Sequence, residues 1–384
     1  MKILEICNFS AGICGVWTRV IEESKRLVEK GHEVAIFSSN LEKGTNKTVS
    51  CDEKIGSIKI KRFSALVPGH DKLSFIPGGE SFMFFKFAQD AMKFNPDVIF
   101  VHNYRQFHTT EALKIVKRLK IKGKKCKVFL VTHAPFPEGD ITRTFWGHAA
   151  SWFYDFFIGR FTLNKFDKIL TISHWEIPFL KKIGAKKSKI VYIPNGIPEE
   201  FFFQKKSSEE KKILFLGRIS PKKKIETLIS AIPFLKDKKI KIEIVGPAEE
   251  EYMAKLTSLV KSLNVSERII FSPPIFDIKE KIKKIDSCKI YVLPSRVEGM
   301  PQSLIEGMAR EKIVIGSNSL AIRDLIKNKK NGFLFEFDNP KDLAQKIDLA
   351  LVSNGNILQK NARKSVENFQ WEKVIEKIEK EISY

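Results

Sequence analysis

The chain has 384 residues, of which 43% are hydrophobic and 29% charged, and 67 Lys and Arg against 45 Asp and Glu give a formal net charge of +22. This length exceeds one ordinary core and fits two of about 150–200 residues, while the composition excludes disordered, collagen-like and disulfide-scaffold proteins. Basic residues exceed acidic ones by 12 in residues 1–200 and by 10 in residues 201–384. We therefore expect a polyanionic partner, such as a nucleotide, a phosphorylated substrate, nucleic acid or an anionic membrane surface.

The cysteines and the first residues favour a cytoplasmic protein. The cysteines form no C-x-x-C pair and no zinc-like spacing, which fits free thiols in a reducing compartment. Glu5 interrupts the first apolar run and no small-residue cleavage site follows, so we expect no secretory signal. The five cysteines are Cys7, Cys14, Cys51, Cys126 and Cys288.

Short apolar runs alternate with longer amphipathic ones through the first half, which is typical of βα units around a parallel sheet. We predict helices over Val16–Lys30, closed by Gly31, and over Phe84–Phe94 before Asn95-Pro96. The predicted strands are Lys2–Asn8, Glu33–Ser38, Ile58–Phe63, Val98–His102, Val128–Thr132 and Lys168–Ile172.

The segment Phe145–Leu163 is the most membrane-like part of the chain. His148, Asp155 and Arg160 interrupt it, so a transmembrane span is not expected. Its polar residues fall on one narrow helical stripe, and we interpret it as a helix buried on most sides in preference to an interfacial membrane helix. The interfacial alternative stays open because the chain has 31 Phe.

A second series of elements follows Pro194-Asn195-Gly196 and a polar linker predicted over Gln204–Lys212. It ends in an amphipathic helix over Trp371–Ile382. The predicted strands are Ile213–Leu216, Ile240–Val245, Arg268–Phe271, Ile290–Leu293, Ile313–Gly316 and Gly332–Phe335. Two doubly wound domains, 1–200 and 201–370, are the simplest solution, with the active site in a cleft between them. We expect residues 371–384 to form a helix that packs back on the N-terminal domain.

The most specific motif is the stretch Glu298–Glu306, which follows the strand Ile290–Leu293 and Pro294-Ser295. Pro301 suits the first turn of a helix, and the unpaired amides of the next three residues would then face a phosphate at the positive end of the helix dipole. Glu298 precedes this helix start and Glu306 lies about a turn and a half inside it. One carboxylate can therefore reach a group in front of the phosphates, and the other can bind a vicinal diol.

A second motif follows the first strand of the second domain. Gly217-Arg218 forms a turn that would hold a guanidinium at the cleft, and Lys223 lies at the start of the helix Ile225–Ala231. Two cations on one diphosphate supply what a metal would otherwise provide. We find no Asp-x-Asp element and expect neither a bound metal nor a cofactor.

At these motifs the chain resembles the retaining glycosyltransferases of family 4, which have the GT-B fold: an α/β architecture of two facing Rossmann-like domains with doubly wound parallel sheets and a cleft between them. The resemblance implies that Glu298 contacts hydroxyls of the donor sugar, that Glu306 binds the ribose, and that Arg218 and Lys223 neutralise the leaving diphosphate. It also implies that loop amides hold the sugar and the diphosphate, at Gly299, Met300, Ser303 and Leu304, beside Gly217.

Two residues of the first domain have weaker support. Gly15 begins a helix where the family usually has two adjacent glycines, and it would let the donor phosphate approach. His133 ends a buried strand, where the family often has a histidine close to the transferred sugar; the alternative is a structural histidine. His102 and His108 have weaker claims.

The resemblance implies transfer of a hexosyl group from a UDP- or GDP-sugar to the hydroxyl of a sugar or lipid-linked acceptor, with retention and without metal. The spread charge and the aromatic segments Phe82–Phe87 and Phe145–Leu163 also allow peripheral contact with an anionic membrane. A nucleotide-sugar epimerase of the same architecture is the alternative. Specific nucleic-acid binding is not expected, because no basic motif interleaved with aromatics or helix-turn-helix pattern is present.

Overall fold

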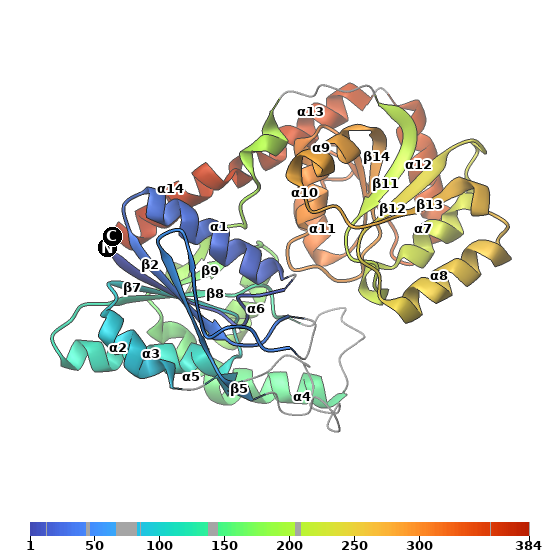
Figure 1. The fold of residues 1–384 in the computed structure, drawn as a ribbon. Helices are drawn as coiled ribbons and strands as arrows, with labels where there is room; N and C mark the ends of the chain where they lie inside the picture. Colours follow the sequence, from blue (N-terminus) through green and yellow to red (C-terminus); the bar gives the residue numbers. More distant parts are fainter. Residues whose placement is uncertain are drawn as a thin grey trace. The chain divides into compact units, whose positions relative to one another are not determined.

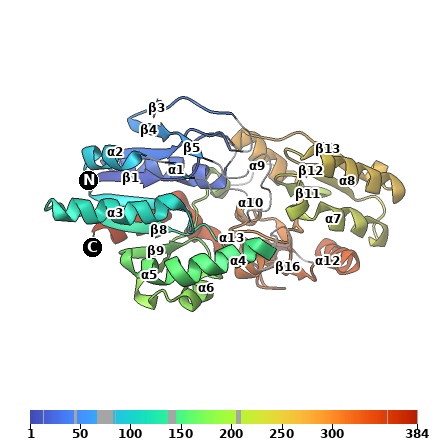
Figure 2. The ribbon, with the colours of Figure 1, turned by 90° about the horizontal axis from the view of Figure 1, so that it is seen from below.

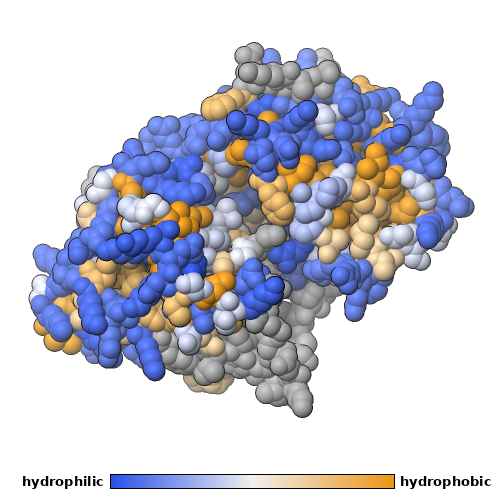
Figure 3. Space-filling view, in the orientation of Figure 1, coloured by the Kyte–Doolittle hydropathy of each residue, from blue (hydrophilic) through white to orange (hydrophobic). Residues whose placement is uncertain are grey.

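The computed structural model describes residues 1–12, 14–43, 47–66, 83–84, 86–136, 145–203, 209–353 and 355–383. It divides into two compact units, one formed by Met1–Asn195 with Glu372–Tyr384 and the other by Gly196–Trp371. Each unit is a sheet flanked by helices (Figures 1 and 2). The face drawn in Figure 3 is mostly hydrophilic, with apolar side chains in patches.

The first unit contains an eight-stranded sheet in the order β10-β9-β8-β7-β1-β2-β4-β3, parallel throughout except that β3 runs antiparallel to β4. From β1, successive strands are added on one side as far as β4 and then, from β7, on the other side. The switch point therefore lies between β1 and β7, and ligands bind at such points in open parallel sheets. The strands are β1 (Lys2–Ile6), β2 (Glu33–Ser39), β3 (Asp52–Ile55), β4 (Ile58–Phe63), β7 (Val98–His102), β8 (Lys127–Val131), β9 (Lys168–Thr171) and β10 (Ile190–Tyr192), with β5 (Ala65–Leu66) and β6 (Met83–Phe84) in a separate pair.

Helices cover both faces of this sheet because its strands are apolar on both sides. On one face α1 (Gly15–Glu29) packs Val20 against Ile36 and Ile58. On the other face, residues of α2 (Phe87–Phe94), α3 (Phe107–Ile121) and α6 (Glu176–Ile183) join the larger core cluster.

The last helix, α14 (Trp371–Ser383), lies with the first unit from Glu372 onward, as Figure 1 shows, and contacts His32, Lys127 and Lys168 of that unit. The buried face of α14 is apolar: its residues Val374, Ile375, Ile378 and Ile382 are all at most 2% exposed. At its polar edge, Glu379 Oε1 lies 2.7 Å from His32 Nε2, and Lys127 Nζ donates to the Ile382 carbonyl at 2.9 Å.

The second unit contains a six-stranded parallel sheet in the order β13-β12-β11-β14-β15-β16, so its switch point lies between β11 and β14. Its strands are β11 (Glu210–Leu216), β12 (Lys241–Val245), β13 (Ile269–Ser272), β14 (Cys288–Leu293), β15 (Ile313–Ser317) and β16 (Phe333–Phe335). Its helices are α7 (Ile225–Ala231), α8 (Glu250–Ser262), α9 (Ile278–Asp286), α10 (Gln302–Ala309), α11 (Leu320–Leu325), α12 (Pro340–Val352) and α13 (Gly355–Val366).

Three sequence-based expectations about elements are wrong. The linker predicted over Gln204–Lys212 ends earlier, because β11 begins at Glu210, and residues 204–208 lie outside the described chain. The helix predicted to begin at Phe84 begins at Phe87, because Phe84 belongs to β6 and Lys86 has a left-handed φ of 67°. Phe82 is outside the described residues.

The segment Phe145–Leu163 also differs from the interpretation as one helix buried on most sides. It consists of α4 (Phe145–Tyr154), a π turn (Asp155–Gly159) and α5 (Arg160–Thr162), and five of its aromatic side chains are exposed. Among the described residues, no helix combines the length and apolarity needed to span a bilayer.

Candidate functional site

In the second unit, two loops leave the carboxyl ends of the neighbouring strands β11 and β14. The first holds Gly217, Arg218 and Lys223, and the second holds Glu298. A backbone hydrogen bond of 3.0 Å from the Arg296 amide to the Lys222 carbonyl joins the two loops. The topology therefore brings the two sequence motifs, about 75 residues apart in the chain, to the switch point of one sheet.

Lys223 and Glu298 form a direct ion pair. Lys223 Nζ lies 2.5 Å from Glu298 Oε1, and their side chains are 21% and 11% exposed. Arg218 is exposed and directly follows Gly217. A carboxylate and an ammonium this close hold each other in place, so both are available at a fixed position for a ligand that carries hydroxyls and phosphates.

Glu306 lies on α10 and is 7% exposed. Lys281 of α9 donates to its Oε1 at 2.6 Å, whereas Oε2 is buried and has no hydrogen-bond partner among the described residues. A buried carboxylate oxygen without a donor is costly, and groups of this kind are common where a ligand supplies the missing hydrogen bond. Lys281 is a site residue that the sequence motifs do not reveal.

The start of α10 differs from the expected row of unpaired amides. Pro301 is the N-cap residue, with φ −78° and ψ 80°, instead of the first helical residue. These angles are those of an inverse γ-turn, in which the Gln302 amide donates to the Met300 carbonyl, here at 2.9 Å. The Leu304 amide donates to the Pro301 carbonyl at 3.1 Å. These two amides therefore reach a phosphate only if those bonds open.

Tyr291 of β14 fixes the position of α10. Its ring packs against Gly307, where an added Cβ would come within 3.0 Å, and its hydroxyl donates to the Leu216 carbonyl at 2.9 Å. The Ser303 hydroxyl also bonds to Tyr291, whose pKa is raised by burial. Ser303 and Gly307 thereby anchor the helix to the strands that carry both loops. Gly299 is half-buried and Met300 is 9% exposed.

The loop at Gly217 depends on a close backbone crossing. Gly246, at the end of β12, has φ +149°, and a Cβ there would lie 2.0 Å from the Gly217 carbonyl oxygen. The Gly217 amide donates to the Val245 carbonyl at 3.0 Å. Glycine is thus required at Gly246 for Arg218 to leave the sheet where it does.

In the first unit, His133 is the end of a chain of buried polar side chains. His133 Nε2 lies 2.8 Å from His102 Nδ1, and His102 Nε2 lies 2.7 Å from Glu5 Oε2. His102 and Glu5 are 0% exposed and come from the adjacent strands β7 and β1 on the two sides of the switch point. His108 Nε2 donates to the His102 backbone carbonyl at 2.8 Å and does not belong to this chain of side chains.

Burial controls the protonation of these groups. It raises the pKa of Glu5 to about 8, against the opposing field of Arg19, and lowers the pKa of His102 to about 3. The pKa of His133 is also well below its usual range, because of burial and the nearby His102 and Arg19. At neutral pH the two histidines are uncharged and Glu5 carries its proton.

The backbone at His133 is unusual, with φ values of 55° and 52° at His133 and Ala134. Left-handed non-glycine residues in sequence are rare and concentrate at functional sites. The Glu176 carboxylate holds the turn by accepting the Ala134 amide at 2.8 Å and the Ile172 amide at 2.8 Å. Glu5 and Glu176 were missed by motif reasoning. For Glu5 the available signal was a carboxylate among the apolar residues of strand β1, whereas Glu176 is the first residue of helix α6 and had no such signal.

Gly15 is the first residue of α1 and is exposed, and a Cβ added there would meet no atom within 4 Å. The structure therefore gives no steric reason for glycine at this position. Its predicted role in phosphate approach stays a prediction.

The model for glycosyl transferases group 1 matches residues 196–369, and the model for glycosyltransferase family 4 matches residues 13–201. The chain is 24% identical over 386 residues to an uncharacterized glycosyltransferase of Methanocaldococcus jannaschii, covering 96% of this chain and 94% of that protein. A second uncharacterized glycosyltransferase of this organism is 28% identical over 219 residues, which cover 56% of this chain and 59% of that protein.

A third relative is the N,N'-diacetylbacillosaminyl-diphospho-undecaprenol alpha-1,3-N-acetylgalactosaminyltransferase of Campylobacter jejuni. It is 28% identical over 215 residues, which cover 50% of this chain and 55% of that protein. The chain thus spans little more than half the length of this relative and of the second Methanocaldococcus protein.

Two solved structures show the fold. Sucrose-phosphate synthase from Thermosynechococcus elongatus superposes with a TM-score of 0.74 at 17% identity, covering 99% of this chain and 97% of that one. Anabaena HepE in complex with UDP and glucose gives a TM-score of 0.73 at 15% identity, covering 100% and 99%. These similarities confirm the predicted GT-B fold class.

Proposed function

This chain belongs to the glycosyltransferases of family 4, and we propose that it moves a hexosyl group from a UDP- or GDP-sugar to an acceptor hydroxyl with retention at the anomeric carbon and without a metal ion. The observation that carries the proposal is the pair of carboxylates at the switch point of the second unit, each fixed by a lysine. The complex of Anabaena HepE with UDP and glucose supports a nucleotide-sugar donor.

Glu306 suits the ribose of the donor. Its Oε2 is buried and lacks a donor, and the two hydroxyls of a ribose are hydrogen-bond donors of the right kind. Lys281 keeps Oε1 occupied at 2.6 Å and so directs the second oxygen to the ligand. Glu298, at the neighbouring loop, would accept hydrogen bonds from hydroxyls of the transferred sugar.

Arg218 and Lys223 suit the diphosphate. As the glycosidic bond breaks, negative charge grows on the leaving diphosphate, and stabilisation there lowers the barrier more than equal binding of the ground state would. Lys223 can turn from Glu298 to a phosphate oxygen, which frees Glu298 for the sugar. The leaving phosphate would take the proton of the acceptor hydroxyl, so no separate base is needed.

His133 is the proposed contact of the first unit with the transferred sugar. Its Nε2 is engaged by His102, which leaves Nδ1 as the nitrogen for a ligand. Because the imidazole is uncharged at neutral pH, it would act as a hydrogen-bonding group and not as a cation. Gly15, Gly217, Gly299, Met300, Ser303 and Leu304 are proposed to line the donor by resemblance alone.

The acceptor is proposed to be a glycolipid or polysaccharide precursor at the cytoplasmic face of a membrane. The Campylobacter relative is named for a diphospho-undecaprenol acceptor, which supports this class. A nucleotide-sugar epimerase is not favoured, because both matching family models are of glycosyltransferases.

The test is a thermal-shift panel of nucleoside diphosphates and their sugars, because a ligand that binds only the native state raises the melting temperature. We expect one base to stabilise the protein. With the matching donor, NMR of the product would show retained configuration and the free nucleoside diphosphate. Conversion of the donor to its epimer without an acceptor would instead establish the alternative.

A further inference from the structure

An exposed aromatic face lies on the segment Trp152–Phe161 of the first unit. Its side chains are exposed by 64% at Trp152, 55% at Phe153, 46% at Phe156, 51% at Phe157 and 65% at Phe161. Trp152 stacks on Phe156 with ring centroids 5.4 Å apart, and Phe153 packs against Phe157 with tilted rings and centroids 4.5 Å apart. A contiguous face of this kind is rare on soluble monomers and marks an interaction site.

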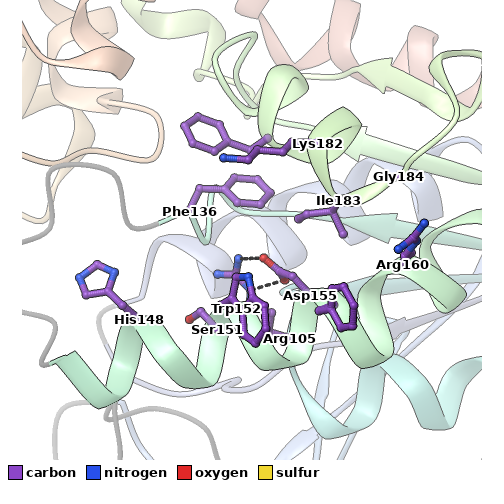
Figure 4. A pocket seen from close by; sticks show the side chains of 12 residues that line it. Arg105, Phe136, His148, Ser151, Trp152, Asp155, Arg160, Lys182, Ile183 and Gly184 are labelled. Carbon is purple, nitrogen blue, oxygen red and sulfur yellow. Dashed lines mark hydrogen bonds and ion pairs between the residues drawn. The ribbon is translucent and has the colours of Figure 1, made fainter.

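A pocket of about 750 Å³ adjoins this face, between α4 with its π turn and α6 (Figure 4). Trp152 and Phe156 belong to both the face and the pocket wall, and Phe179 and Ile183 line the side of α6. Phe136 stacks on Phe179 with centroids 5.2 Å apart and extends the apolar part of the wall, beside polar lining residues such as His148 and Ser151. The volume and lining suit a hydrocarbon chain.

Arg105 and Asp155, two of the six polar residues that line the pocket, satisfy each other. Arg105 forms a bidentate pair with Asp155, at 2.8 Å and 2.5 Å, and also donates to the Pro135 carbonyl at 2.8 Å. Figure 4 shows this pair at the centre of the pocket, with its dashed contacts. Asp155 therefore places no unbalanced negative charge against a ligand.

The π turn is built into the core. Tyr104 donates to Asp155 at 3.0 Å, and its hydroxyl lies 2.0 Å from where a Cβ on Gly159 would be. Only glycine lets the helix pass this tyrosine, and the wider turn accommodates it. The face and the pocket are thus held by buried contacts and are not the product of a loose surface helix.

The surrounding charge is positive. Arg160 and Lys182 line the pocket, and residues 145–190 contain eight Lys and Arg against three acidic residues. All three acidic residues are engaged internally: Asp155 with Arg105, Asp167 with the Val128 amide at 2.7 Å, and Glu176 with backbone amides. Arg160 and Lys182 are therefore cations at the pocket that adjoins the aromatic face, in a segment with a positive net charge, which complements an anionic bilayer.

We propose that this segment docks on an anionic membrane, with the aromatic face in the lipid interface, the hydrocarbon chain of one lipid in the pocket, and the lipid phosphate at Arg160 and Lys182. The inference rests on the proposed function, since it gives a glycosyltransferase access to an acceptor carried by a lipid. Beyond the proposed function, it specifies where the protein binds the membrane, which lipids it binds and which residues bind them.

The first experiment is co-sedimentation with vesicles of phosphatidylcholine alone or with phosphatidylglycerol. Wild-type protein should sediment with the anionic vesicles, and the double variant Trp152→Ser/Phe156→Ser should lose at least tenfold in partition. Phe276→Ser, at a 76% exposed phenylalanine of the second unit, is the matched control and should bind like wild type. Equal binding of the double variant, or binding that salt alone abolishes in all variants alike, would overturn the proposal.

A second experiment tests the pocket with decyl phosphate below its micelle concentration, beside decanol and inorganic phosphate. Only decyl phosphate should raise the melting temperature clearly, and Ser151→Trp, which fills the pocket, should remove that shift. A shift with inorganic phosphate alone, or one unaffected by Ser151→Trp, would contradict a lipid site.

These results separate the two proposals. Nucleoside diphosphate binding without vesicle binding would overturn only the lipid site, and vesicle binding without nucleotide binding would overturn only the proposed function. Self-association through the aromatic face, seen as a wild-type dimer that the double variant disrupts and that does not sediment with vesicles, would identify a second copy as the occupant and refute the lipid proposal.

Discussion

At the scale of single residues, the chemistry depends on where two carboxylates and two cations are held. Lys223 Nζ lies 2.5 Å from Glu298 Oε1, and in the proposed mechanism the lysine turns toward the arriving diphosphate while Glu298 accepts a sugar hydroxyl. Arg218 is exposed on the loop that also carries Lys223, and we propose that it contacts the diphosphate as well. The site thus contains both cations and carboxylates, which suits a ligand with phosphates at one end and hydroxyls at the other.

We predict that Arg218→Ala and Glu298→Gln each lower transfer by about 10²–10³-fold, the usual cost of removing one group that stabilises charge in the transition state. The melting temperature should stay near that of wild type, since neither side chain belongs to the core. Lys222→Ala, at an exposed lysine of the same loop, is the matched control and should keep the wild-type rate. Wild-type rates in Arg218→Ala or Glu298→Gln would refute these assignments.

The buried Glu5 gives a second prediction at this scale. Its pKa is about 8 in the folded protein and near 4.5 when unfolded, so between these values the native state holds a proton that the unfolded chain releases. Its contribution to stability is therefore full below pH 4.5 and is lost as pH rises toward 8. The pKa values of His102 and His133 are lowered, so their contribution to stability is full above pH 6.5 and is lost as the pH falls below that value.

Urea unfolding at pH 5 and pH 8 tests this. Wild type should lose more free energy of unfolding between the two values than Glu5→Gln, which cannot ionise. An equal loss in the two proteins would show that Glu5 is already ionised at pH 5 in the folded state.

The motif residues could be predicted from the sequence, but their partners could not. Glu298, Arg218 and Lys223 stand at recognisable spacings after strands. Lys281 lies 25 residues from Glu306 and Glu5 lies 97 residues from His102, so only the strand order brings each pair together. No local pattern encodes such pairings.

At the scale of elements, the crossing of Gly246 over Gly217 positions the loop that carries Arg218. We predict that Gly246→Ala destabilises the protein by about 1–3 kcal/mol or more and weakens nucleotide binding, because the new Cβ would overlap the Gly217 carbonyl. Gly123→Ala is the control: it shares a positive φ, +80°, but has open space around it. Chemical denaturation of both variants separates the effect of steric overlap from the effect of a positive φ. An equal loss of free energy of unfolding in the two variants would contradict the steric explanation for Gly246.

The sequence predicted β4, β7 and α7 at their observed boundaries. β7 is an apolar run, β4 begins with apolar residues that alternate with lysines, and α7 follows the basic turn after Gly217-Arg218. It missed β3, whose residues Asp52–Ile55 are mostly charged; as an edge strand it buries little and needs no apolar pattern. The break in Phe145–Leu163 was missed because Tyr104, from another part of the chain, determines it.

At the scale of the whole molecule, the chain crosses between its two units twice and ends in the first, through α14. Removing residues 372–384 would expose the sites of Ile375, Ile378 and Ile382, each worth about 1.5–3 kcal/mol when buried. Their sum is comparable with the 5–15 kcal/mol that stabilises a typical domain.

We therefore expect a chain that ends at Trp371 to lose the cooperative unfolding of its first unit, measured by thermal melting. Deletion of residues 383–384 alone, which keeps Ile382, is the control and should melt like the full chain. An unchanged melting curve in the longer deletion would show that α14 does not support this unit.

The central claim is that fixed protein cations, without a metal, receive the diphosphate of a nucleotide sugar. Calorimetric titration of the full chain with UDP and with GDP, in excess EDTA, tests it most directly. The account predicts one-to-one binding of at least one of them, undiminished by EDTA, and at least tenfold weaker, about 1.4 kcal/mol, in Arg218→Ala. Binding of neither nucleotide, binding that EDTA removes and a divalent ion restores, or equal affinity in Arg218→Ala would contradict it.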